Sequence, residues 1–266
     1  MRVSPSPAVV LFSLSADARS GEAGSMQAVT AAAESMLQFL VEHDVAATWG
    51  TRSPVDFKGA GAIDEQHPRQ ALAISLAADD SPRIVEQLRR EALRSRAAGL
   101  SVASALVPRS LSGDMYQLLV KYGIAAIHIA ESGLQTEVAT SRGLWRRSRW
   151  LLPLSARASE IPQKLRWGLW RMPQALDLAR DGVRRLRQAV DRAVGAGDMV
   201  HLHVDLAEAA SQHSRLMDDA RSVVRQIASY ADQGRLRSET LAGAAAGLTW
   251  QRVAAPACSI LRRRAA

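Results

Sequence analysis

Two segments of the chain are almost continuously apolar, and each ends at polar residues. Residues 9–14 read VVLFSL and are followed by Ser15 and Asp17, while residues 198–204 read DMVHLHV and are followed by Asp205. A strand that is buried on both faces has this unbroken pattern, rich in β-branched residues. The pattern therefore predicts central, buried strands at 9–14 and 198–204, each with an acid at or just beyond its carboxyl end.

Helical and strand-like patterns alternate along most of the remaining chain. The predicted helices, identified by apolar residues three and four positions apart, cover 25–43, 81–99, 112–123, 174–197, 214–234 and 238–247. The further predicted strands cover 45–50, 70–78, 100–108 and 124–130. This alternation favours a parallel sheet or barrel with its helices outside, in which ligands bind at the carboxyl ends of the strands.

The length of the chain is sufficient for one large domain. Of its 266 residues 47% are apolar, which is enough to bury one substantial core. We expect a single domain over residues 1–250 and a flexible basic tail over 251–266, with an irregular segment at 131–173. No apolar run approaches the roughly 18 residues of a membrane span.

Charge and cysteine content restrict the partners and the compartment. The formal net charge of +8 favours anionic partners, although an arginine- and alanine-rich composition is also typical of GC-rich genomes. No nucleic-acid motif of defined spacing is present, so we expect no specific nucleic acid partner. Cys258 stands alone, which excludes a disulfide framework and a cysteine-based zinc site. No signal-peptide cleavage site follows the first apolar run, and we expect a cytoplasmic protein.

The late apolar strand places three side chains with metal-binding chemistry on one face. Side chains alternate along a strand, so His201, His203 and Asp205 point the same way. Such a set can bind zinc or a similar ion. Alternatively, His201 is a core histidine bonded to the backbone, and only the residues nearer the strand end reach solvent.

The order and spacing of several segments resemble the polysaccharide deacetylase family, the NodB-homology carbohydrate esterases. The resemblance runs from about residue 8 to 246 and rests on four segments: VEHDVAATWG, ASALVPRSLSGDMYQLLVKYGIAAIHI, LRQAVDRAVGAGDMVHLHVDL and LMDDARSVVRQIASYADQGRLRSETLAGAA. It implies a distorted, incomplete (β/α) barrel. It also implies a divalent metal held by one acid and two histidines, a second acid as base, and a histidine that protonates the leaving amine.

The resemblance assigns roles to individual positions of this chain. Aligned on FSL, the catalytic base falls on Ser15 and the metal-binding acid on Asp17. The late-strand histidine corresponds to His203, or the position falls on Asp205, and Arg109 after Pro108 matches the arginine that orients the acid. The implied catalytic residues are Asp17, His203 and Arg109. A serine cannot accept a proton at neutral pH without an activating partner.

The histidine pair of the family is absent from this sequence. No histidine occurs from residue 68 to 127, His67 precedes its strand, and Asp79 and Asp80 lie where they can cap a helix. We therefore predict no bound metal and no other cofactor. If a divalent metal such as zinc is bound, the predicted ligands are Asp17, His201, His203 and Asp205.

Tryptophan and arginine interleave within the irregular segment. Aromatic faces stack on sugar rings and arginine pairs with acidic groups, so we predict substrate contacts from Trp145, Trp150, Trp167 and Arg146. The same composition also fits a long loop held against the barrel by its tryptophans.

Three functions are compatible with these patterns. The first is a polysaccharide deacetylase-like protein of cell-surface carbohydrate metabolism that is catalytically degenerate and binds glycan or acts as a scaffold beside polysaccharide-synthesis enzymes. The second is an active metal-dependent hydrolase that removes acetyl groups through a rearranged site. The third is a basic surface-binding protein without a link to sugars. We favour the first.

Overall fold

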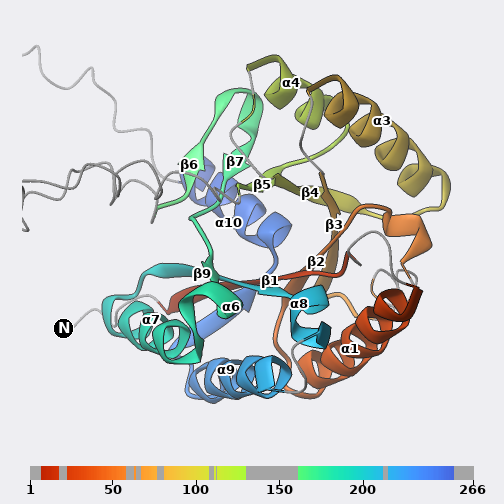
Figure 1. The fold of residues 1–266 in the computed structure, drawn as a ribbon. Coiled ribbons are helices and arrows are strands. Elements are labelled where there is room, and N and C mark those ends of the chain that lie inside the picture. The colour runs from red at the N-terminus through yellow and green to blue at the C-terminus, as the bar shows by residue number, and fades with distance from the viewer. Residues whose placement is uncertain are drawn as a thin grey trace, which may run out of the picture.

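The protein is a curled, mostly parallel sheet with helices packed around it (Figure 1). The computed structural model describes residues 7–17, 23–57, 63, 67–76, 81–107, 111, 113–129, 161–211 and 215–254. The strands are β1 (Ala8–Ser15), β2 (Ala47–Thr51), β3 (Gln70–Ser75), β4 (Val102–Val107), β5 (Ala126–Ile129), β6 (Gln163–Lys164), β7 (Trp170–Arg171), β8 (Leu176–Asp177), β9 (Met199–Asp205) and β10 (Leu236–Glu239). Their order is β6-β7-β5-β4-β3-β2-β1-β9-β8, and β10 pairs with β1 off this path.

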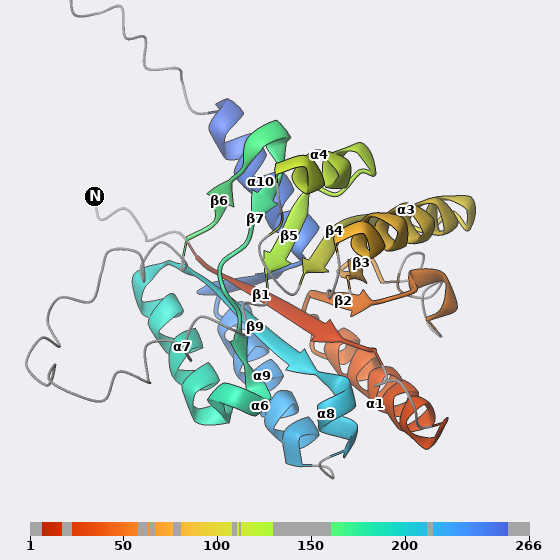
Figure 2. The same cartoon turned by 45° about the horizontal axis from the view of Figure 1, so that its top comes forward.

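Helices follow most of these strands, and most of them cover the outside of the sheet, whereas the last helix packs against inward-facing residues such as Leu11 (Figure 2). They are α1 (Ala23–Glu42), α3 (Ser81–Ala97), α4 (Gly113–Lys121), α6 (Leu178–Asp181), α7 (Val183–Ala196), α8 (Leu206–Ser211), α9 (Arg215–Asp232) and α10 (Leu241–Ala254), with short 3-10 turns η1 (Pro54–Asp56) and η2 (Arg166–Gly168). Among the described residues, no helix is both long and apolar enough to cross a membrane.

The two strands predicted to be central are central. β1 lies beside β9 along its whole length on one side, and on the other side β10 pairs with its first half and β2 with its second half. β9 in turn lies between β1 and β8. The prediction of central strands is therefore confirmed; β1 is buried along most of its length, whereas β9 mixes buried and half-buried residues.

Alternate side chains of β1 pack into two different hydrophobic clusters. Phe12 and Leu14 point outward and pack in a cluster with apolar residues of α1, α7 and α9. Leu11 points inward, where Trp170 and Leu241 of α10 share its cluster. Apolar side chains thus fill the interior of the barrel around Leu11, and the carboxyl half of β1 carries inward-facing polar groups.

The predicted helix at 174–197 is wrong in its first third. Residues 176–177 form β8 beside β9, and α6 is a single short turn whose amino end is capped by the side chain of Asp177. Gly182 then adopts φ 76° and ψ 154°, a conformation that a helix does not contain, and α7 begins after it. Amphipathic residues on both sides of Gly182 make the sequence pattern look continuous.

The carboxyl-terminal elements also differ from the prediction. Residues 236–239 form β10, and the predicted helix at 238–247 begins at Leu241 and continues to Ala254. The first residues of the predicted basic tail therefore belong to α10, and residues 255–266 lie outside the described part of the chain. The short strands β6 and β7 were likewise not predicted.

Candidate functional site

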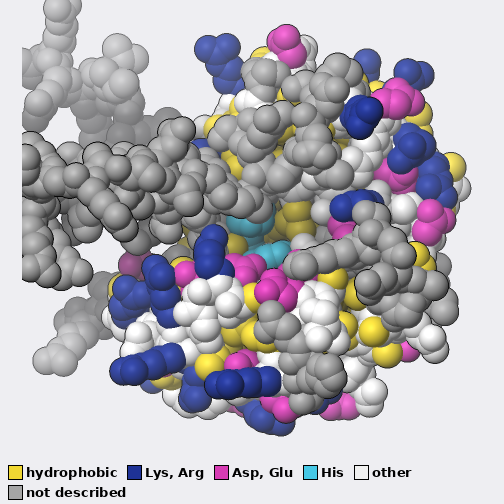
Figure 3. All heavy atoms as spheres, viewed as in Figure 1, with side chains coloured by type: hydrophobic (Ala, Val, Ile, Leu, Met, Phe, Trp, Pro, Cys, Tyr) yellow, Lys and Arg dark blue, Asp and Glu magenta, His cyan; other side chains and the backbone are white. Residues whose placement is uncertain are grey.

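Serine and histidine side chains meet on the inner face of β1 and β9. The register of the two strands places Ser13 opposite His203 and Ser15 opposite Asp205. Because side chains alternate along a strand, Ser13 and Ser15 share their inner face with His201 and His203. Figure 3 shows histidine side chains in a hollow near the centre of this face of the molecule.

His201 is a buried histidine that bonds to the backbone, as one of the two interpretations of the sequence expects. It is 1% exposed, and its Nδ1 lies 3.1 Å from the carbonyl oxygen of Pro173. Burial lowers the pKa of His201 from 6.5 to about 3, so the ring is neutral at neutral pH. A carbonyl oxygen only accepts hydrogen bonds, so Nδ1 carries the proton and Nε2 carries a lone pair.

The hydroxyl of Ser13 completes the contacts of His201. Its Oγ lies 2.8 Å from Nε2 of His201 and 3.4 Å from the carbonyl oxygen of Leu202. A hydroxyl has one proton, and without it the oxygen and the Nε2 lone pair would face each other at the shorter distance. Ser13 therefore donates to His201, and its oxygen remains free to accept.

The same reasoning fixes the tautomer of His203. Its Nδ1 lies 3.0 Å from Oγ of Ser13, which has already donated its proton to His201, so Nδ1 donates. Nε2 of His203 then carries a lone pair, and Oγ of Ser15 lies 3.2 Å from it. The carbonyl of Pro173 thus sets the direction of four successive hydrogen bonds that end at the hydroxyl of Ser15.

Charged groups surround His203 at the carboxyl end of β9. Burial lowers the pKa of His203, the carboxylates of Asp177 and Asp205 oppose that shift, and Arg180 adds to it. Oδ1 of Asp205 also accepts hydrogen bonds from two backbone N–H groups at the start of α8, at 2.8 and 3.2 Å. Asp205 therefore caps a helix while its charge favours a proton on His203.

A third histidine, which sequence reasoning missed, lies beside this pair. His128 of β5 is 3% exposed, and its ring meets that of His201 edge-on with 4.5 Å between centroids. The centroid of His203 is 6.1 Å away. Burial and the neighbouring histidines hold the pKa of His128 well below 6.5. The one available signal was a histidine inside the apolar strand IAAIHIA.

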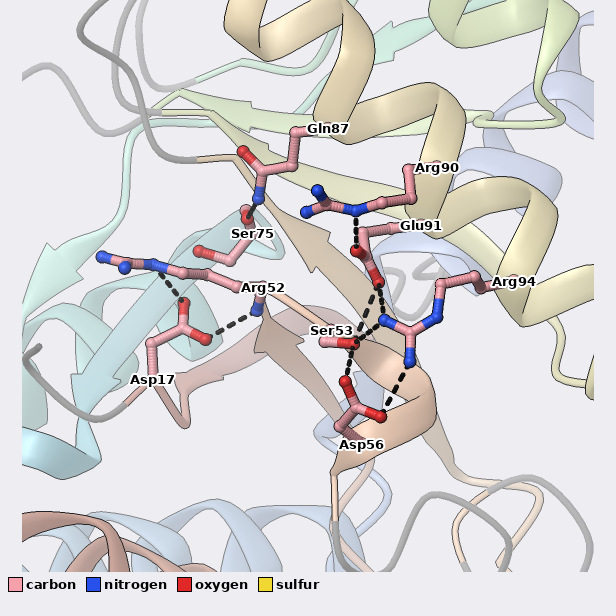
Figure 4. Close-up of polar contacts among 9 residues, drawn as sticks. All are labelled: Asp17, Arg52, Ser53, Asp56, Ser75, Gln87, Arg90, Glu91 and Arg94. Carbon is pink, nitrogen blue, oxygen red and sulfur yellow. Dashed lines mark hydrogen bonds and ion pairs between the residues drawn. The ribbon is translucent and has the colours of Figure 1, made fainter. Parts of the chain in front are cut away.

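Asp17 is held on the opposite side of β1, by the ends of β2 and β3 (Figure 4). Its Oδ1 accepts a hydrogen bond of 2.6 Å from the backbone N–H of Arg52, and its Oδ2 lies 4.0 Å from Nε of the same residue. Burial raises the pKa of Asp17, while hydrogen bonds from Arg52, Ser75 and Thr51 act against the shift. The hydrogen bonds and ion pairs between described residues therefore tie Asp17 to β2 and β3 rather than to His203.

The remaining predicted residues divide into two groups. Arg109, Trp145, Trp150 and Arg146 lie outside the described residues, as do Asp79 and Asp80. Trp167 lies in η2 and is 48% exposed. The strand that follows it, β7, runs parallel to β5 and pairs with its first residue, so Trp167 lies at the amino end of the strands. It is therefore at the opposite end of the barrel from the serine–histidine cluster.

The metal set implied by the resemblance does not fit the arrangement of these side chains. Within the described residues, no group of three or more histidine, cysteine, aspartate or glutamate side chains can hold a metal ion. Both ring nitrogens of His201 are hydrogen-bonded, Asp205 caps α8, and Asp17 is bonded to β2. The alternative ligand set is thus not assembled in this conformation.

Comparison with known proteins supports the fold. No family model and no curated protein matches the chain. Among solved structures, it is similar to a candidate polysaccharide deacetylase from Mycobacterium smegmatis, at 13% identity and a TM-score of 0.67, over 94% of this chain and 92% of that one. It is also similar to PuuE allantoinase (10% identity, TM-score 0.55, 87% of each chain).

A third similar structure is larger. A 4-alpha-glucanotransferase from Thermococcus litoralis shares 13% identity at a TM-score of 0.58, over 88% of this chain and 39% of that one. At these identities the likeness concerns the fold, and it confirms the predicted distorted (β/α) barrel. The chain therefore has the fold seen in structures of the polysaccharide deacetylase type.

Proposed function

We propose that this chain is a polysaccharide deacetylase-like protein that binds carbohydrate at the carboxyl ends of β1, β5 and β9 and has lost metal-dependent deacetylation. One observation carries the proposal. The position that resembles the family's catalytic base is Ser15, and its hydroxyl is bonded to His203. The surviving acid, Asp17, is bonded to the backbone N–H of Arg52, just after β2.

The chemistry of the hollow supports a polar ligand. Ser15 and His203 are partly exposed, and the acids Asp177 and Asp205 lie close enough to His203 to alter its pKa. Hydroxyl, imidazole and carboxylate groups are donors and acceptors for sugar hydroxyls. Two of the similar solved structures have names that refer to polysaccharide or glucan chemistry, which favours a carbohydrate ligand.

The proposed role is that of a subunit that binds glycan beside enzymes that make or modify cell-surface polysaccharide. It requires no metal and no other cofactor. The family's deacetylation needs an acid at the position of Ser15 and an ion to stabilise the developing oxyanion, and the described residues assemble neither.

Metal content and acetate release test the loss of deacetylation. Protein purified without a histidine tag is expected to contain well under one equivalent of zinc, nickel, cobalt or manganese. It is also expected to release no acetate from chito-oligomers at a rate that a chelator abolishes. One equivalent of metal that disappears in His203→Ala, or chelator-sensitive acetate release, would establish the rearranged metal site instead.

Glycan binding is tested separately, with neutral oligosaccharides, with acidic oligosaccharides, and with a DNA duplex whose charge matches that of the acidic oligosaccharides. We expect His203→Ala to weaken oligosaccharide binding at least tenfold, and Trp250→Ala, which removes an exposed tryptophan of α10, to leave it unchanged. If Trp167→Ala abolishes binding and His203→Ala does not, the glycan binds at the amino end of the barrel and the proposed location is wrong. Equal binding of DNA would favour a basic surface protein.

A further inference from the structure

The contact between Ser15 and His203 has the geometry of a nucleophile and its base. Their Oγ and Nε2 atoms are 3.2 Å apart, at the outer limit of the separation found between catalytic serines and their histidines. A serine hydroxyl is a poor nucleophile unless a neighbouring base removes its proton. His203 is the activating partner that the sequence did not reveal.

The hydrogen-bond chain holds His203 in the tautomer that a base requires. Nδ1 donates to Ser13, so the lone pair of Nε2 faces Ser15. In a serine hydrolase triad a carboxylate fixes the histidine in this orientation. Here Ser13 orients the ring of His203. The hydroxyl of Ser13 is itself oriented by its hydrogen bond to His201, whose other ring nitrogen is bonded to the carbonyl of Pro173.

The charges near His203 suit a group that gains and loses a proton. Burial keeps the ring neutral at rest, which leaves the base ready to accept. The carboxylates of Asp177 and Asp205 stabilise the imidazolium once it forms. They supply the negative charge that stabilises the imidazolium, which the neutral hydroxyl of Ser13 cannot supply.

Access differs along the chain of hydrogen bonds. Ser13 and His201 are fully buried, whereas Ser15 and His203 are partly exposed at the carboxyl ends of their strands. A substrate can therefore reach only the Ser15 end. The inner members are placed to orient the outer pair and not to react themselves.

We propose that Ser15 is a nucleophile, with His203 as its general base, in metal-independent acyl transfer from O-acyl esters. That the acyl group is carried by a sugar rests on the proposed function, while the serine chemistry does not. Esters are favoured over amides because an alkoxide leaves more readily than an amide anion, and the described residues assemble no cluster of side chains that could hold a metal to polarise an amide.

The reaction balances with water as the second substrate. Oγ of Ser15 bonds to the acyl carbon as its proton passes to Nε2 of His203. The bond between that carbon and the sugar oxygen then breaks, and the sugar oxygen takes the proton from Nε2. Water, deprotonated by His203, attacks the acyl-serine, and Oγ recovers its proton as the free acid leaves.

Covalent labelling of the full-length chain tests this assignment. A fluorophosphonate probe is expected to add to Ser15, as read by peptide mass spectrometry, and EDTA is expected to leave the rate unchanged. Ser15→Ala abolishes the adduct, and Ser229→Ala, which removes an exposed serine of α9, does not. His203→Gln is expected to slow labelling about 10²- to 10⁴-fold, the usual contribution of a general base.

The positioning role of Ser13 has its own measurement. Ser13→Ala is expected to slow labelling and to change the pH profile of the labelling rate, because both tautomers of His203 become accessible. Ser13→Thr, which keeps a hydroxyl, is expected to restore the rate and the pH profile. In the unmodified protein the rate should stay high below pH 6.5, because burial lowers the pKa of His203. Thermal melting of each variant establishes that it is folded.

Four outcomes test the two proposals separately. A folded protein that gives no adduct at Ser15 overturns the assignment, as does a labelling rate unaffected by His203→Gln. Loss of glycan binding with Ser15 still reactive would overturn the carbohydrate proposal alone and leave the serine chemistry standing. Glycan binding without a reactive Ser15 would do the reverse.

Discussion

The side chain of Asp17 accepts a hydrogen bond of 2.6 Å from the backbone N–H of Arg52, which joins the end of β1 to the end of β2. The acid that the family resemblance assigns to metal binding thus has a structural partner in this chain. Its burial is only partly offset by that partner, because the net effect is a raised pKa. Asp17 therefore opposes folding whenever it is ionised.

Asp17→Asn is expected to stabilise the protein at neutral pH. A carboxyl whose folded pKa lies above its unfolded value of 3.8 loses stability as pH rises through that interval, and the loss persists above it. The asparagine keeps the oxygen that Arg52 needs without the charge. Thermal unfolding at pH 7.5 should show a higher Tm, by about 2–4 °C for each 1 kcal/mol gained in the free energy of unfolding. The gain should shrink toward pH 4. Asp218→Asn, at an exposed ion pair, is the control and should change little.

His201 is expected to make the protein sensitive to acid. Its folded pKa of about 3 lies below the unfolded value of 6.5, so the unfolded state binds more protons between these values. The contribution of His201 to the free energy of unfolding is fully present above pH 6.5. It falls by up to about 1.4 kcal/mol per pH unit as pH decreases toward 3. Urea unfolding from pH 7.5 to 4.5 measures the slope. His201→Phe should flatten it and, by leaving Ser13 and Pro173 without their partner, should lower stability at pH 7.5 by about 1–3 kcal/mol for each buried group.

A side chain at Gly50 is expected to displace Leu106. Gly50 pairs with Ser15 across β1 and β2, and a Cβ at this position would lie 2.1 Å from Cδ1 of Leu106 in the interior of the barrel. Gly50→Ala should therefore destabilise the protein by about 1–3 kcal/mol, the usual effect of overpacking. Gly195→Ala, in α7 with open space around it, should instead gain about 0.5–1 kcal/mol. Rescue of Gly50→Ala by Leu106→Ala would identify the clash as the cause, and an unchanged unfolding midpoint for Gly50→Ala would contradict it.

Glu91 joins α3 to the turn that follows β2 (Figure 4). The carboxylate is buried, accepts a hydrogen bond of 2.9 Å from Oγ of Ser53, and pairs with Arg90 and Arg94. Glu91→Gln should lower the free energy of unfolding by about 1–3 kcal/mol, less than a fully buried pair because both arginines reach solvent. Glu86→Gln, at an exposed position of the same helix, should have no measurable effect in the same denaturation assay.

The central strands could be predicted because burial on both faces of a strand produces a recognisable run of apolar residues in the sequence. The runs VVLFSL and MVHLHV are almost continuously apolar, and both segments are central strands. β10 has no such run, since its residues Leu-Arg-Ser-Glu alternate between buried and exposed over only four positions. Its place beside β1 depends on contacts with residues more than two hundred positions earlier in the sequence.

Only some members of the serine–histidine cluster could be selected from the sequence, and none of their hydrogen bonds could be. His203 and Asp17 could be selected because polar groups at the ends of apolar strands are conspicuous, and the shared face of His201 and His203 follows from alternation. The bond from Ser13 to His201 spans 188 residues, and the role of Ser13 inside an apolar run appears only once β1 and β9 are aligned. The same holds for Ser15, whose residue type suggested an inert replacement until its partner was known.

The position of β1 between late-made partners has a consequence during protein synthesis. Val9 pairs with Met199, and Ala8 pairs with Leu236, so the apolar first strand lacks most of its neighbours until the ribosome has made β9 and β10. At about 5–20 residues per second, that interval lasts roughly 10–50 seconds. Throughout it, the nascent chain carries an unpaired, strongly apolar strand of the kind that aggregates. Formation of the barrel therefore waits until β9 and β10 have been made, and a chaperone that binds exposed apolar segments should find its first target at residues 9–14.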